Sequence, residues 1–251
     1  MRVPGLAAVA SLLLLAPVAL PSQQLDPAAN PPAAPKAAAA ARERFYWPDP
    51  YPLDRAWRTG ELDALAGILE LEGAGNLGGQ ARREHHRVLL ALLEQVGDSR
   101  YAAALAQLWP QNHLQVLRAL SETAGEDSLS LPAVYPLSFG PRRPGEPSVQ
   151  ECAARISAAA AGDTLSRLVT RIERQPGGEP VPIAPDAPAR VELRVWVGAS
   201  GVPLLSRVGF WYPADSAALA AARQAVATWR FTPASALGCG IPNLYEVRLR
   251  P

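Results

Sequence analysis

Apolar and polar residues alternate over residues 190–197, and this period of two is typical of a half-buried β-strand. The apolar positions are Val191, Leu193, Val195 and Val197, separated by Arg190, Glu192, Arg194 and Trp196. The stretch GASG follows, and VPLLSRVGF then continues as a second apolar run. We therefore expect a β-hairpin whose turn lies at the two glycines.

A helical pattern comes next along the chain. Residues 216–229 are rich in alanine, and Asp215 is the expected N-cap of this helix. Its apolar stripe, at three- and four-residue steps, consists of Leu219, Ala222, Val226 and Trp229. The last stretch, residues 243–250, alternates again and puts Tyr245, Val247 and Leu249 on one face. For residues 189–251 this order predicts three antiparallel strands backed by one helix.

The larger N-terminal part of the chain has helical periodicity. Residues 53–127 predict a small all-helical domain, with breaks at Gly97 and at Pro110. A further helix is expected over residues 149–175. The fold class is therefore α+β: a helical domain, then a module in the order β-β-α-β.

Two Pro-rich stretches divide these segments. Residues 23–52 predict a linker rich in proline and alanine that ends in an aromatic arm, and residues 128–148 predict a second connector. The arm and the start of the helical domain carry five aromatic residues: Phe45, Tyr46, Trp47, Tyr51 and Trp57.

The N-terminus indicates export. Residues 3–20 are uncharged and apolar, and polar residues follow them. This run is short for a membrane-spanning helix, which needs about 20 residues, and is typical of a secretory signal. We expect residues 1–22 to be a cleaved signal peptide or, alternatively, an uncleaved membrane anchor. Contact with a membrane is expected only through an uncleaved N-terminus.

Export changes the interpretation of the two cysteines, Cys152 and Cys239. In an oxidising compartment a disulfide is the default state of such a pair, so we expect them to be bonded to each other. The alternative is two free thiols, one of them buried as a small hydrophobic residue. The net charge of +1 provides no field that would attract nucleic acid, so no nucleic-acid partner is expected.

Two motifs invite a chemical interpretation. Residues 73–78, GAGNLG, match G-x-G-x-x-G, but a dinucleotide fold needs a buried strand before the glycines, and a helical pattern precedes them here. The stretch Glu84, His85, His86 places its histidines on different faces of a helix, and His113 is the one other histidine. We expect an interhelical loop and a solvated helix surface, with no cofactor and no metal.

No catalytic motif accompanies these residues. Neither H-E-x-x-H nor G-x-S-x-G occurs, and nothing places a nucleophile, a base and an orienting acid at a familiar spacing. We therefore expect a protein that is not an enzyme. The alternative is an enzyme with an unrecognised site around residues 84–86.

The C-terminal quarter resembles a known family. A hairpin with a small-residue turn, an alanine-rich helix, the sequence WRFTPA at residues 229–234, a Gly-containing loop and a final strand together resemble the C-terminal domain of TonB. TonB couples to outer-membrane transporters. The resemblance implies that Trp229 and Phe231 fill the gap between helix and sheet, that Arg230 points outward, and that Pro233 stops the helix.

The resemblance also implies where a partner binds. In TonB-like domains the last strand is an edge that accepts an extended peptide from a transporter by β-augmentation. Here that strand consists of Asn243, Leu244, Tyr245, Glu246, Val247, Arg248, Leu249 and Arg250. Charged residues can also protect an edge from aggregation, and the sequence does not separate the two roles.

Two features of the sequence differ from those that TonB uses to transduce energy. The N-terminal apolar segment lacks the histidine of the TonB anchor, and the Pro/Ala linker is short. We therefore expect an exported periplasmic or cell-envelope protein that binds an outer-membrane transporter or another envelope protein. The alternative is a structural envelope protein that self-associates through the same edge.

Overall fold

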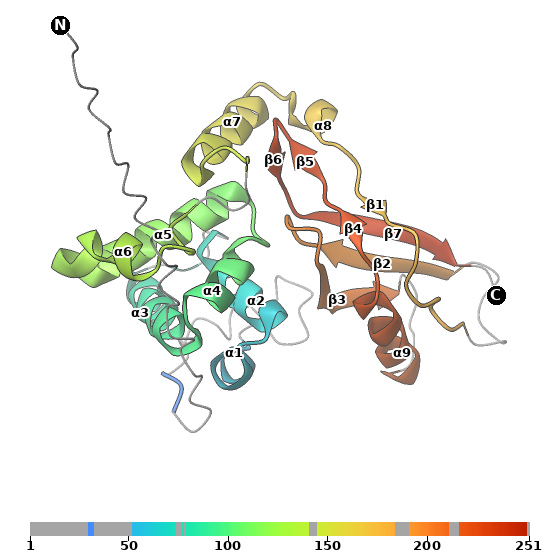
Figure 1. Cartoon of the computed structure of the whole chain (residues 1–251), viewed down its shortest axis with the longest axis horizontal. Helices are drawn as coiled ribbons and strands as arrows, with labels where there is room; N and C mark the ends of the chain where they lie inside the picture. Colours follow the sequence, from blue (N-terminus) through green and yellow to red (C-terminus); the bar gives the residue numbers. More distant parts are fainter. Residues whose placement is uncertain are drawn as a thin grey trace, which may run out of the picture.

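The computed structural model describes residues 30–32, 52–73, 77, 79–140, 145–183, 191–210 and 216–249. The expected signal or anchor (1–22), nearly all of the linker and aromatic arm, Asp215 and Arg250 lie outside these residues. Figure 1 shows a helical unit (residues 52–140) at one end of the molecule and a sheet unit (residues 169–183, 191–210 and 216–249) at the other. The mixture of helices and small antiparallel sheets confirms the α+β class.

Five helices form the body of the helical unit. They are α1 (Leu53–Thr59), α2 (Leu62–Gly73), α3 (Gly79–Val96), α4 (Asp98–Leu105) and α5 (Pro110–Ala124). Gly97 separates α3 from α4 with a φ of 79°, which a residue with a side chain rarely adopts, and Pro110 occupies the first turn of α5. The chain therefore breaks where the sequence pattern places the breaks. Trp57 is buried in α1.

The expected connector over residues 128–148 is partly helical. A short 3₁₀ helix, η3 (Gly125–Leu129), leads into α6 (Leu131–Val134), and Tyr135 and Phe139 then pack against the core of the helical unit. The carboxylate of Asp98 accepts hydrogen bonds from the backbone N–H groups of Leu137 and Ser138, both at 2.8 Å. Buried aromatic side chains and these two bonds keep the segment on the helices.

The single helix expected over residues 149–175 is wrong. The structure has α7 (Val149–Ala161) and a one-turn helix, α8 (Leu165–Leu168), and the chain then becomes extended. A capping box between Ser148 and Glu151 starts α7. The helix ends before Gly162 and Asp163, and Asp163 has a φ of 52°, which is incompatible with an α-helix.

Three strands form the main sheet, in the order β3-β2-β7. They are β2 (Val191–Val197), β3 (Pro203–Phe210) and β7 (Asn243–Leu249), and both pairings are antiparallel. Helix α9 (Ser216–Ala227) packs on this sheet, and all four alternating apolar residues of β2 are buried. In the hairpin turn Gly201 has a φ of 87°, and a Cβ there would lie 2.6 Å from the carbonyl oxygen of Phe231.

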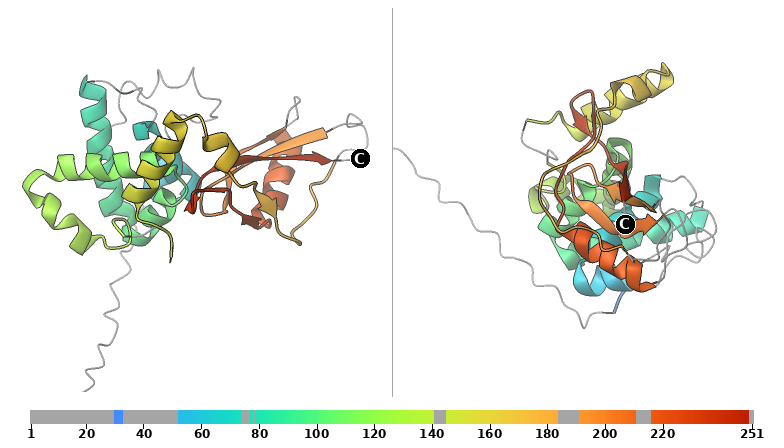
Figure 2. Two further views of the ribbon diagram at one scale, coloured as in Figure 1. Left: turned by 90° about the horizontal axis from the view of Figure 1, so that it is seen from above. Right: turned by 90° about the vertical axis from the view of Figure 1, so that its right-hand side faces the viewer.

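Two short strand pairs add a feature that the sequence pattern does not predict. Strand β1 (Glu173–Arg174) pairs with β4 (Phe231–Thr232), and β5 (Ser235–Ala236) pairs with β6 (Cys239–Gly240). The extended segment after α8 thus lies along the chain that follows α9. Figure 2 shows the strands of the sheet unit projecting away from the helices.

The aromatic residues after α9 fill the space between helix and sheet. Trp229 is 1% exposed and Phe231 is 5% exposed, and Tyr245 of β7 meets the ring of Phe231 at a centroid distance of 5.1 Å. The indole N–H of Trp229 donates to the carbonyl oxygen of Glu179 at 2.7 Å, and the guanidinium of Arg174 lies 4.0 Å from the indole ring centroid. The indole N–H of Trp229 thus has a hydrogen-bond partner although the ring is buried.

The expected role of Pro233 is wrong. Helix α9 ends at Ala227, and strand β4 separates its end from Pro233. Arg230 is exposed, as expected, and its guanidinium donates to the carbonyl oxygen of Trp229 at 3.0 Å. The chain leaves the helix through tighter turns, in which the N–H groups of Thr228 and Trp229 donate to the carbonyl oxygens of Ala225 and Val226.

The predicted disulfide is confirmed: Cys152 of α7 is bonded to Cys239 of β6. Both cysteines are fully buried in a small apolar cluster formed by α7 and residues 234–241. Its other buried members are Ile156, Ala234, Ala236 and Ile241.

The solvated surface expected around residues 84–86 is also wrong. His85 is 0% exposed and His86 is 8% exposed, because α3 packs against α2, α4 and α5 and so buries more than one face. The Nε2 atom of His86 lies 3.1 Å from a carboxylate oxygen of buried Glu72, and Arg82 donates to the other oxygen at 2.7 Å.

We expect the disulfide to stabilise the fold strongly. Replacing Cys152 and Cys239 together by serine should lower the free energy of unfolding by about 4–5 kcal/mol in the chain-entropy model, because the bond spans 87 residues. Urea denaturation measures this difference, and the reduced wild-type protein serves as a control. A loss below about 1 kcal/mol would contradict the prediction.

We also expect His85 to make stability fall in acid. Burial, with the nearby His86 and Arg82, lowers the pKa of His85 from 6.5 to about 3, so the folded state favours the neutral ring. The unfolded chain takes up a proton as the pH falls from about 6.5 towards 3, and stability falls by up to about 1.4 kcal/mol per pH unit. A His85→Gln variant should lack this part of the slope in urea titrations, and parallel curves would refute the assignment.

Candidate functional site

The two edges of the main sheet differ in what covers them. At the β3 edge, Ser206 donates its backbone N–H to a carboxylate oxygen of Asp63 in α2 at 2.6 Å. Arg207 of β3 forms an ion pair with Glu70, also in α2, and Arg223 of α9 donates to the carbonyl oxygen of Ser206. The helices therefore satisfy backbone groups that a further strand would need.

The position of Asp63 between α2 and the β3 edge shifts the pKa of its carboxyl group. Burial raises the pKa of its carboxyl group, while the hydrogen bond from Ser206 acts in the opposite direction by stabilising the ionised form. The carboxylate is thus a desolvated acceptor, held against the sheet edge by α2.

The β7 edge is open among the described residues. Strand β7 is last in the sheet order, and its register with β2 runs without interruption from Asn243 opposite Val197 to Leu249 opposite Val191. No backbone hydrogen bond joins its other side to a described residue. The backbone groups on this side of β7 therefore have no strand partner among the described residues.

The hydrogen bonds also identify which residues of β7 face outward. The N–H of Leu244 donates to the side-chain oxygen of Asn243 at 2.8 Å, so it does not point at β2. Because backbone groups alternate along an antiparallel strand, Glu246 and Arg248 face outward with Leu244.

The side chains of β7 alternate as the sequence predicts. Tyr245, Val247 and Leu249 pack against the core of the sheet unit, and Glu246 and Arg248 are exposed. Glu246 pairs with Arg194 at 2.8 Å and Arg248 pairs with Glu192 at 3.3 Å. Each pair joins directly opposed residues of β7 and β2, so these charges match the register of the two strands.

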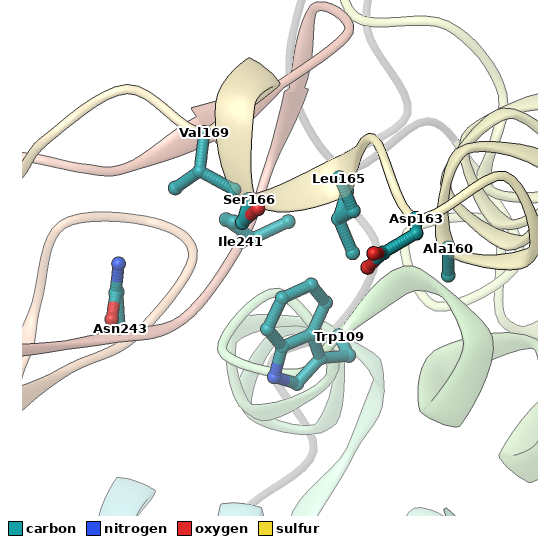
Figure 3. Close-up of a pocket in the computed structure, with 8 residues that line it drawn as sticks. All are labelled: Trp109, Ala160, Asp163, Leu165, Ser166, Val169, Ile241 and Asn243. Carbon is teal, nitrogen blue, oxygen red and sulfur yellow. The ribbon is translucent and has the colours of Figure 1, made fainter.

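A pocket of about 430 Å³ adjoins the start of β7. Figure 3 shows Trp109, from the segment before α5, below Leu165 of α8, with Ile241 beyond them and Asn243 to one side. The other lining residues are Ala160, Asp163, Ser166 and Val169. The walls come from three separate parts of the chain, which explains why no sequence pattern indicated the pocket.

The remaining sequence-based candidates do not gather into one site. Trp229 and Phe231 belong to the core of the sheet unit, and Pro233 follows β4. The bonded cysteines share an apolar cluster with four pocket residues: Trp109, Leu165, Val169 and Ile241. The described part of the chain contains no group of three or more histidine, cysteine, aspartate or glutamate side chains suited to a metal ion. GAGNLG begins at the last residue of helix α2, and part of it lies outside the described residues.

Among the helices that the structure describes, none combines the length and the apolar run that crossing a bilayer requires. Comparison of the chain with models of protein families, with curated proteins and with solved structures gives no match.

The contact between Asp63 and Ser206 can be tested by substitution. Asp63→Ala should lower the free energy of unfolding by about 1–3 kcal/mol, because the partly buried N–H of Ser206 loses its acceptor. Asp63→Asn keeps an oxygen acceptor at this position and should retain most of the stability. Urea denaturation at neutral pH compares the variants, and equal losses in both would show that the hydrogen bond is not what matters.

Proposed function

We propose that this protein is an exported, TonB-like binding protein whose strand β7 accepts an extended peptide from an outer-membrane transporter. The observation that carries the proposal is the asymmetry of the sheet: α2 covers the edge at β3, while β7 pairs with β2 alone among the described residues. β-Augmentation needs such an exposed edge and supplies main-chain hydrogen bonds to it.

Three further observations support this function. The strand order β3-β2-β7 with α9 on one face fits the order inferred from the resemblance to the TonB C-terminal domain. Tyr245 of β7 packs against the rings of Trp229 and Phe231, so the core of the sheet unit supports the inner face of this strand. The disulfide is of the kind that persists in an oxidising compartment.

Glu246 provides the test with the least disturbance to the fold. Its N–H faces outward, so Glu246→Pro removes one donor for the peptide and keeps the pairing with β2. Glu246→Ala is the matched control, because it loses the same ion pair with Arg194 but keeps the N–H. Val247 would be a poor choice, because its N–H points towards β2.

We expect peptides from the N-terminal regions of outer-membrane transporters to shift the amide resonances of residues 244–248 in nuclear magnetic resonance titrations. Glu246→Pro should weaken binding by about 3- to 10-fold, as expected for one hydrogen bond, and Glu246→Ala by less than about twofold. No shifts at millimolar peptide would refute the proposal. A molar mass that doubles with concentration would instead favour self-association through this edge.

A further inference from the structure

We propose that the pocket at the start of β7 is a side-chain subsite for the peptide bound at that edge, and that it selects a large apolar residue next to a basic one. This inference rests on the proposed function of β7. It adds the chemistry of the ligand, which the backbone pairing alone does not define.

The apolar part of the preference follows from the lining. Trp109, Leu165 and Val169 are each partly exposed, and Ile241 is buried behind them. Trp109, Leu165 and Val169 pack against the cluster that surrounds the disulfide, so the pocket has a fixed apolar floor. An apolar side chain placed there would leave water and contact the indole ring.

The size of the pocket limits the ligand. Its volume of about 430 Å³ lies near the lower end of the range of roughly 300–1,000 Å³ for ligand pockets. A single large side chain with its backbone suits this space.

The preference for a neighbouring basic residue follows from Asp163. Its side chain is exposed at the pocket, and Figure 3 shows the carboxylate between Leu165 and Ala160, above Trp109. No ion pair joins it to a described residue. A cationic group next to the apolar side chain would meet this charge at the rim.

The position of Asn243 connects the pocket with the edge. Asn243 is the first residue of β7 and lines the pocket. Its side-chain oxygen also accepts a hydrogen bond from the N–H of Leu244. A peptide that pairs with Glu246 and Arg248 advances by about 3.3 Å per residue. Two or three further residues would therefore bring its side chains to the pocket.

The test uses three synthetic peptides with blocked ends and the full-length exported protein. The first is Thr-Val-Thr-Val-Thr, which can only pair with the edge. The other two extend it by Phe-Arg, one at the N-terminus and one at the C-terminus, because the pocket meets a different end in parallel and in antiparallel pairing. Affinities come from titrations that follow the amides of residues 244–248 and the indole N–H of Trp109.

We expect one extended peptide to bind about tenfold more tightly than the short one and to shift the Trp109 indole resonance. Leu165→Gln should abolish this gain without changing the affinity of the short peptide. Leu168→Gln is the matched control, since Leu168 belongs to the same short helix, is 42% exposed and does not line the pocket. Asp163→Asn should reduce the gain from the arginine.

The outcomes separate the two proposals. Equal affinities of all three peptides, with shifts at β7, would overturn the subsite and leave the edge as the binding site. A gain that survives Leu165→Gln would also overturn the subsite. Binding of none of the peptides at millimolar concentration would count against both proposals.

Discussion

The covalent bond between Cys152 and Cys239 constrains the part of the chain that links the helical unit to the sheet unit. It attaches α7 to β6, and β6 continues within three residues into β7. Weaker contacts follow the same route: Glu146 accepts the N–H of Gly240 at 2.8 Å, and Arg155 donates to the carbonyl oxygen of Leu237 at 3.5 Å. The disulfide and these two hydrogen bonds therefore hold α7 and the segment before it against the chain that leads into β7.

The helical unit makes the two edges of the main sheet different, because it covers only one of them. A three-stranded sheet has two edges, and each would pair with a further strand if it were left uncovered. In helix α2, Asp63 accepts a hydrogen bond from β3 and Glu70 forms an ion pair with it. Gln107, just after α4, accepts a hydrogen bond from the hydroxyl of Ser200 in the hairpin turn at 2.7 Å. This leaves β7 as the edge that the described residues do not cover, so an incoming strand has one place to add.

The sequence predicted what local periodicity determines, and it failed where distant residues decide. The alternation in β2 and β7 and the breaks at Gly97 and Pro110 follow from short-range rules, and the resemblance to TonB placed Trp229 in the gap between helix and sheet. The long helix over residues 149–175 was wrong because extended pairing of Glu173 with β4 outweighs helical periodicity. His85 was misplaced because its burial depends on three other helices, and the pocket was missed because its walls are distant in sequence.

The geometry of β7 limits what this strand alone could recognise in a bound peptide. Since Leu244 already donates its N–H to Asn243, the outward donors left on β7 are those of Glu246 and Arg248. Two donors allow few backbone hydrogen bonds to a peptide, and backbone hydrogen bonds do not distinguish one extended peptide from another. The side chains of Glu246 and Arg248 are engaged with β2, which further reduces what the strand itself can recognise. If a peptide pairs with β7 as proposed, its specificity would come from groups beside the strand, and Trp109, Leu165 and Asp163 line the pocket at the start of that strand.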